Sequence, residues 1–217
     1  MKKIVTFYKS FSLASILFVF TLALTSSSSM YAQFTFFDFK TTPVQTSLPI
    51  NLTVGGITAY LTATGSGYSI QQANVLGFTP VGFNGFCIYP NSVYASDLQI
   101  SFDQTLSDFS IMYSPQELGC DDSATMIVTA YMNAILVGTN TTTITNPGTW
   151  PTGILSCTFP SGFNNVVVHY ASHPPTCQDY GVIFMADNMQ ISQSNLSDTN
   201  YSRILVAGSI SPNPVFT

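Results

Sequence analysis

Hydrophobic and polar residues alternate in short runs along most of the chain after residue 33. In the clearest run, Leu98, Ile100 and Phe102 alternate with polar neighbours. A period of two with many β-branched and aromatic residues is typical of strands that bury one face. The predicted strands are 35–39, 52–63 with a break at Gly55-Gly56, 67–70, 85–89, 98–103, 109–113 after a turn near 105–107, 124–131, 135–143, 153–159, 165–170 and 181–192.

Turn residues separate these strands at intervals of 8 to 12 residues, and no amphipathic helix follows residue 33. This spacing indicates an all-β fold, an antiparallel sandwich or barrel. The domain is predicted over residues 33–192. A polar tail or linker follows over residues 193–217.

The first 32 residues have the pattern of a secretory signal peptide, expected to be helical. Lys2 and Lys3 precede a dense apolar run over 11–24, and a serine cluster leads to the small residue Ala32. No later apolar stretch approaches the roughly 20 residues that span a bilayer. The mature protein is therefore predicted to be secreted or in the cell envelope, without a membrane span.

Charge is scarce and one-sided after the predicted cleavage site. After residue 32 the chain has two basic residues, Lys40 and Arg203, and ten acidic residues, which give a net charge of −8. Such a chain repels phosphate backbones, which argues against nucleic-acid binding. A surface of uncharged polar residues suits a polysaccharide or a cell-surface glycan, although many secreted β-proteins share this composition.

Alternating strand directions place the loops 115–123, 144–152 and 171–180 at one end of the sandwich. Trp150 lies in the second loop, where an exposed ring can stack on a sugar while polar groups bond its hydroxyls. Alternatively, Trp150 caps the core. The candidate ligand-binding residues are Trp150, Tyr113, Asp121, Asp122, His173, Asp179 and Tyr180.

Four cysteines in an exported chain predict two disulfides. Cys120 and Cys177 lie in two of the converging loops and are the preferred pair, which leaves Cys87 to pair with Cys157. The first bridge would bring Asp121, Asp122 and Asp179 together near Glu117. That group would be either a calcium site or an ordinary acidic loop.

Two segments resemble known families. The run from Gly181 to Ile191, with Asp187-Asn188 inside it, and the opening Phe36-Phe37-Asp38-Phe39 are similar to the closing and first strands of jelly-roll, galactose-binding-like domains, which include carbohydrate-binding modules. The resemblance implies an antiparallel β-sandwich of jelly-roll type. It also implies a structural Ca²⁺ with Asp38 and Asp187 as ligands. Alternatively, Asp187 accepts hydrogen bonds from backbone N–H groups in a turn.

The tail Ser211-Pro212-Asn213-Pro214 resembles the start of the sorting domain of the type IX secretion system of Bacteroidetes, cut short at Thr217. This second resemblance implies a bacterial envelope protein.

Catalytic patterns are sparse. The sequence has no GxSxG elbow, and Glu117 is its sole glutamate. His169, His173 and Cys177 have a helical metal-ligand spacing, but they fall on a predicted strand and loop. The sequence thus predicts a non-enzymatic, carbohydrate-binding sandwich. The alternatives are a structural or adhesive surface module and, less favoured, a hydrolase.

Overall fold

The chain separates into two units, residues 1–32 and 33–217. The computed structural model describes residues 34–75, 77, 79–115, 124–144, 151–172 and 183–194, all in the second unit. The predicted signal peptide and most of the tail therefore lie outside the described residues. Within these ranges, no helix has the length and apolarity that a bilayer crossing requires.

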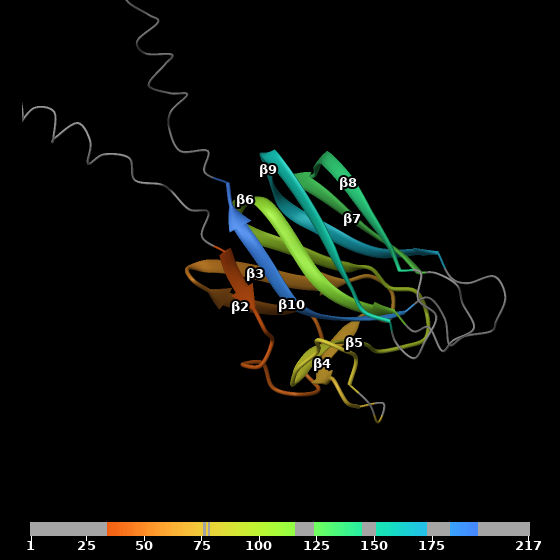
Figure 1. The fold of residues 1–217 in the computed structure, drawn as a ribbon. Helices are drawn as coiled ribbons and strands as arrows, with labels where there is room; N and C mark the ends of the chain where they lie inside the picture. The colour runs from red at the N-terminus through yellow and green to blue at the C-terminus, as the bar shows by residue number, and fades with distance from the viewer. Residues whose placement is uncertain are drawn as a thin grey trace, which may run out of the picture. The chain divides into compact units, whose positions relative to one another are not determined.

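The described residues form an all-β, antiparallel sandwich, which confirms the predicted fold class (Figure 1). The ten strands are β1 Phe34–Phe37, β2 Ile50–Val54, β3 Ile57–Ala63, β4 Tyr68–Gln72, β5 Phe86–Pro90, β6 Leu98–Pro115, β7 Ala124–Met132, β8 Ile135–Ile144, β9 Gly153–Ser172 and β10 Phe184–Gln193.

One continuous hydrogen-bonded sheet makes both layers because its two long strands bend. In β6 and β9 the register shifts between residues 101 and 108, opposite residues 158–165. The first layer joins β4, β5, β10 and β1 to the end of β6 and the start of β9. The second layer joins β2, β3, β7 and β8 to the other halves of β6 and β9.

The bends correct one expectation from the sequence. Residues 98–103 and 109–113 are parts of β6, and residues 153–159 and 165–170 are parts of β9, rather than separate strands joined by turns. The buried positions of β6 change from even numbers at Ile100 to odd numbers at Ile111. In the sequence, this change from even to odd buried positions resembles a turn. In the structure, an irregular register within one strand produces it.

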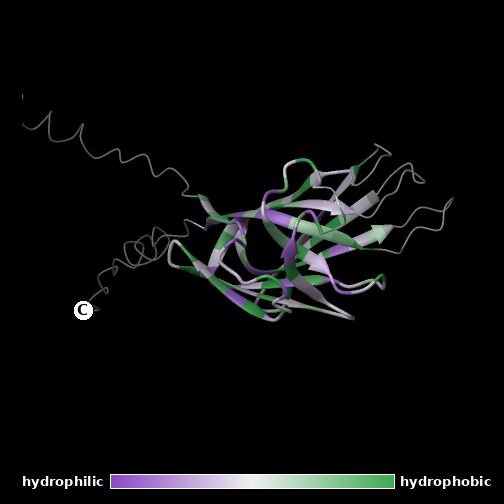
Figure 2. Cartoon of the chain, turned by 90° about the horizontal axis from the view of Figure 1, so that it is seen from below, coloured by the Kyte–Doolittle hydropathy of each residue, from purple (hydrophilic) through white to green (hydrophobic). Residues whose placement is uncertain are grey.

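A single main core lies between the layers. Ile100 from one half of β6 and Ile111 from the other half are both fully buried in it, together with Val168 and Phe184. Hydrophobic and hydrophilic segments follow one another along the strands (Figure 2). The alternation places one set of side chains in the core and the other on the outer faces.

The predicted pairing of Cys87 with Cys157 is wrong. Both are buried, free thiols. Cys157 belongs to the main core, whereas Cys87 belongs to a second, small cluster with Phe83 and Met185 on the outer side of the first layer. Cys120 and Cys177 lie outside the described residues, so their bridge stays a prediction.

Candidate functional site

The strands that flank the three predicted loops end close together. A Cβ built on Gly153 would lie 2.9 Å from Tyr113 Oη and 2.9 Å from Ile144 Cδ1. Ile144 pairs with Ala124, and the next residue of β7 pairs with Ser172. The strand ends on both sides of each loop therefore lie at one end of the sandwich, as the sequence predicted.

Most of the predicted ligand residues belong to these loops. Trp150, Asp121, Asp122, His173, Asp179 and Tyr180 lie outside the described residues. Tyr113 is described, and it is fully buried in the core. Burial raises the pKa of its hydroxyl to about 12, and that hydroxyl has no hydrogen-bond partner among the described residues. Tyr113, a predicted ligand-binding residue, therefore lies in the core and not on the surface, because its odd position in β6 points inward.

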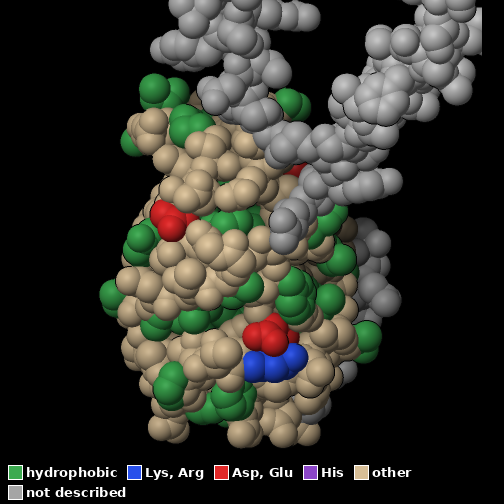
Figure 3. Space-filling model, turned by 90° about the vertical axis from the view of Figure 1, so that its left-hand side faces the viewer, with side chains coloured by type: hydrophobic (Ala, Val, Ile, Leu, Met, Phe, Trp, Pro, Cys, Tyr) green, Lys and Arg blue, Asp and Glu red, His purple; other side chains and the backbone are tan. Residues whose placement is uncertain are grey.

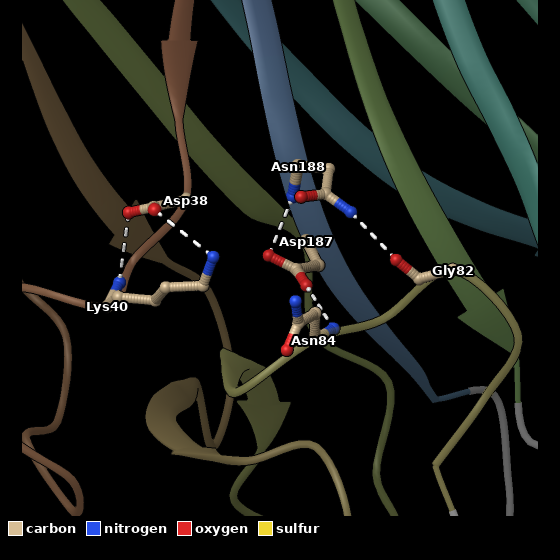
Figure 4. A network of polar contacts seen from close by, with 6 residues as sticks. All are labelled: Asp38, Lys40, Gly82, Asn84, Asp187 and Asn188. Atoms are coloured by element: carbon tan, nitrogen blue, oxygen red, sulfur yellow. Dashed lines mark hydrogen bonds and ion pairs between the residues drawn. The ribbon is translucent and has the colours of Figure 1, made fainter.

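Asp187 is a buried carboxylate at an irregular point of β10. The register shifts just after it, and Asn188 has a φ of 51°. The backbone N–H of Asn188 donates to Asp187 Oδ1 at 2.7 Å, and that of Asn84 donates to Oδ2 at 3.3 Å (Figure 4). Burial raises the pKa of Asp187 to about 6, although these N–H groups and Lys40 act to lower it. Asp187 thus joins the loop before β5 to the bulge in β10.

The predicted calcium ligands do not make a calcium site on their own. Calcium takes six to eight oxygen ligands. Each oxygen of Asp187 already accepts a backbone N–H, and Asp38 Oδ2 lies 3.4 Å from Lys40 Nζ. The described residues hold no group of three or more His, Cys, Asp or Glu side chains suited to a metal. Asp38 and Asp187 therefore do not fit the ion as they are placed here. The predicted calcium site of Asp121, Asp122 and Asp179 lies outside the described residues and stays a prediction.

The outer face of the second layer carries a feature that the sequence did not reveal. Four outward side chains form one row across four strands, because Tyr60 pairs with Ser101, Ser101 with Asn165, and Asn165 with Tyr131. We call these four residues the tyrosine row. Tyr60 is 41% exposed. No outward position of β3, β7 or the second-layer halves of β6 and β9 is buried, so this face stays open.

A shallow pocket of about 390 Å³ opens at one end of the tyrosine row. Its lining contains Ser101, Phe102, Tyr131, Asn133, Ala134, Asn164 and Asn165. The side chains of Asn133 and Asn164 are joined at 2.8 Å, and Asn165 Nδ2 donates to Ser101 Oγ at 2.6 Å. The pocket is thus lined by carboxamides, a hydroxyl and two aromatic side chains, with no charged side chain.

Two positive-φ residues shape this pocket. Asn133 and Ala134 connect β7 to β8 with φ of 49° and 67°. Positive φ at both central residues is the geometry of a tight hairpin turn. The Asn133 N–H donates to Asn164 Oδ1 at 3.0 Å, which fastens the turn to β9. The pocket wall is therefore held by backbone geometry as well as by side-chain bonds.

The other outer face differs because a loop covers part of it. Met185 and Asp187 point outward from β10 but are each 1% exposed under the small cluster of Phe83 and Cys87. Near this region Lys40 and Asp38 form a surface ion pair, on a face where charged side chains are few (Figure 3). Of the two faces, the one that carries the tyrosine row is open across its four central strands.

These features define a β-sandwich with one open, largely uncharged sheet face. No protein-family model matches the sequence, and no curated protein matches it. Solved structures with some similarity include the K1 cleaved adhesin domain of Lys-gingipain from Porphyromonas gingivalis W83, at 12% identity over 73% of this chain and 97% of that one, with a TM-score of 0.43.

The K2 cleaved adhesin domain of Lys-gingipain gives 10% identity over 73% and 99% of the two chains, with a TM-score of 0.45. A family 29 carbohydrate-binding module gives 12% identity over 75% and 89%, with a TM-score of 0.38.

Proposed function

We propose that the protein is a non-enzymatic binding module for a neutral carbohydrate, held on the face of the tyrosine row. The observation that carries the proposal is the pocket of about 390 Å³ lined by carboxamides and Tyr131. Ligand pockets commonly measure about 300–1,000 Å³ and combine apolar surface with a few polar groups. Amide and hydroxyl groups bond sugar hydroxyls, and a tyrosine ring packs on the apolar face of a sugar.

The carboxylates of the described residues serve as hydrogen-bond or ion-pair partners within the sandwich. A glycosidase needs two carboxyl groups on either side of the scissile bond. Here each described carboxylate is bonded to a neighbour. Asp38 pairs with Lys40, Asp97 with His169, Asp103 with the Thr58 N–H, Asp108 with Ser107 and Thr158, and Asp187 with two backbone N–H groups.

Net charge favours a neutral ligand. After residue 32 the chain has a net charge of −8, and the pocket contains no Lys, Arg or His. An anionic polymer would be repelled without a compensating cation. Binding through hydroxyls and rings should therefore change little with salt, since screening acts mainly on charged contacts.

A pull-down of residues 33–217 on immobilised neutral polysaccharides tests the proposal. Tyr131→Ala should weaken binding about tenfold, which corresponds to about 1.4 kcal/mol. Tyr94→Ala is the matched control, since Tyr94 is 73% exposed and lies outside the row and the pocket. Thermal unfolding of each variant separates loss of binding from loss of folding.

A Trp150→Ala variant distinguishes the sheet face from the loop end that the sequence favoured. Loss of binding with Trp150→Ala, but not with Tyr131→Ala, would move the site to the loops. Failure of the parent protein to bind any neutral glycan would overturn the function and favour a structural or adhesive module. The same assay with calcium and with a chelator tests the calcium prediction.

A further inference from the structure

The two long sides of the sandwich differ. On one side β8 lies against the start of β9. Asn140 Nδ2 donates to the Ser156 carbonyl at 2.6 Å, and Gly138 packs against the ring of Phe159. On the other side lie β1 and β2. Among the described strands, β1 pairs only with β10, and β2 pairs only with β3. Each of these strands therefore has one backbone edge without a strand partner.

A groove of about 300 Å³ lies between these two edges. Phe37 and Phe39 are buried beneath it, and Leu52 is half-buried beside it. Phe36 and Val54 are 49% and 38% exposed at its rim, and Asp38 adds a carboxylate. The groove is mainly apolar, which distinguishes it from the carboxamide pocket of the proposed carbohydrate site.

Natural proteins usually protect an exposed sheet edge by keeping the strand short, or with charged residues, proline, a bulge or a covering segment. Of these devices, β1 has only its short length of four residues. The β1 sequence Phe34-Thr35-Phe36-Phe37 has neither charge nor proline, and its pairing with β10 runs without a register shift. Phe34 is 60% exposed as well. An edge of this kind is suited to an added strand, which gains main-chain hydrogen bonds and places alternate side chains in a groove.

The chain itself carries a segment that suits this edge. Residues 203–207, Arg-Ile-Leu-Val-Ala, are an apolar, β-branched run with a basic first residue in an otherwise polar stretch. Side chains at alternate positions, Ile204 and Val206, would face the groove together. The described residues include five aspartates, and Lys40 is their only lysine or arginine. Arg203 would therefore add positive charge to an acidic sandwich.

The end of the described chain is in reach of the groove. Ser192 pairs with Phe34, the first residue of β1, and the described residues end at Ser194. Nine residues from Ser194 to Arg203 can extend about 30 Å. Crossing β1 to its free edge requires two strand spacings, or about 10 Å. A chain that reverses after β10 would run parallel to β1 along that edge.

We infer that residues 203–207 dock as an added strand on the free edge of β1 and cover the groove between β1 and β2. This intramolecular strand shields Phe36 and Val54 from water and occupies the open side of the sandwich. It is independent of the carbohydrate proposal, because the two surfaces share no residue.

Amide hydrogen exchange in residues 33–217 tests the inference. In the parent protein, some β1 amides should be protected beyond those bonded to β10. The double variant Ile204→Asp with Val206→Asp should speed their exchange by about tenfold or more, as for amides that lose a hydrogen-bond partner. Val215→Asp with Phe216→Asp is the matched control, since it adds the same two negative charges to the same tail outside the segment.

Equal β1 exchange in all three proteins would overturn the inference. Protection that increases with protein concentration would assign the groove to a second copy and would overturn it too. The substitutions leave β6 and β9 themselves unchanged, so the exchange of their amides should stay unchanged and serve as an internal check on folding.

Discussion

Asp187 gives the domain a pH dependence opposite to that of an ordinary paired aspartate. Burial raises its pKa from 3.8 to about 6 in the folded state, so the fold prefers the protonated form. The stabilisation that comes from this preference is fully present below pH 3.8 and is lost as the pH rises through 6. We expect the Asp187 contribution to stability to increase by up to about 3 kcal/mol between pH 7 and pH 4.

Urea unfolding at a series of pH values checks this expectation. Other groups also titrate in this range, so the quantity to compare is the difference between the parent protein and Asp187→Asn, which keeps the shape without the charge. That difference should change with pH around 6. A difference that stays constant from pH 4 to pH 7 would contradict the buried, raised-pKa state of Asp187.

At the scale of single elements, Gly138 in β8 is required by packing rather than by backbone geometry. A Cβ at this position would overlap ring atoms of Phe159, and Gly138 is not among the positive-φ residues. Gly138→Ala should therefore destabilise the domain by about 1–3 kcal/mol, the usual cost of overpacking.

A double-mutant cycle with Phe159→Leu tests the cause. The smaller side chain makes room for the new methyl, so Gly138→Ala should cost less in the Phe159→Leu background when the free energy of unfolding is measured with urea. Additive effects would show that the ring is not the obstacle. Phe159 also packs edge-on against Phe163, with ring centroids 6.1 Å apart, so its own substitution has a separate cost.

The elements show which parts of the fold are local properties of the sequence. Alternation located the strands because one face of each is buried, and the Gly55-Gly56 turn between β2 and β3 was visible in the same way. The bends of β6 and β9 could not be predicted from the sequence. An irregular register at residues 103–107 and a turn have similar sequence patterns. Strand directions were sufficient to predict the end where the loops meet.

The tyrosine row could not be found by the same reasoning. Tyr60 is visible as an outward position of an alternating run, but its place beside Ser101 depends on pairing between distant strands. Tyr131 and Asn165 meet through the register of β7 with β9, which no local pattern specifies. Asp187 was identified as a hydrogen-bond acceptor or a metal ligand, and the structure shows the hydrogen bonds.

At the scale of the whole molecule, the number of reactive thiols can be measured. Cys87 and Cys157 are buried and their pKa values are raised to about 12, so neither thiol should react with Ellman's reagent in the native protein. In denaturant, the oxidised protein should show two reactive thiols if Cys120 and Cys177 are bridged. Four thiols would contradict that bridge, and a reduced sample provides the reference value.

The scarcity of cations has a consequence for proteolysis. Among the described residues, Lys40 is the only site after which a trypsin-like enzyme can cut, and its side chain pairs with Asp38. Apart from Arg203, every other lysine or arginine precedes residue 10. A protease that requires lysine or arginine therefore has almost no substrate in this sandwich, which would persist where such enzymes are abundant.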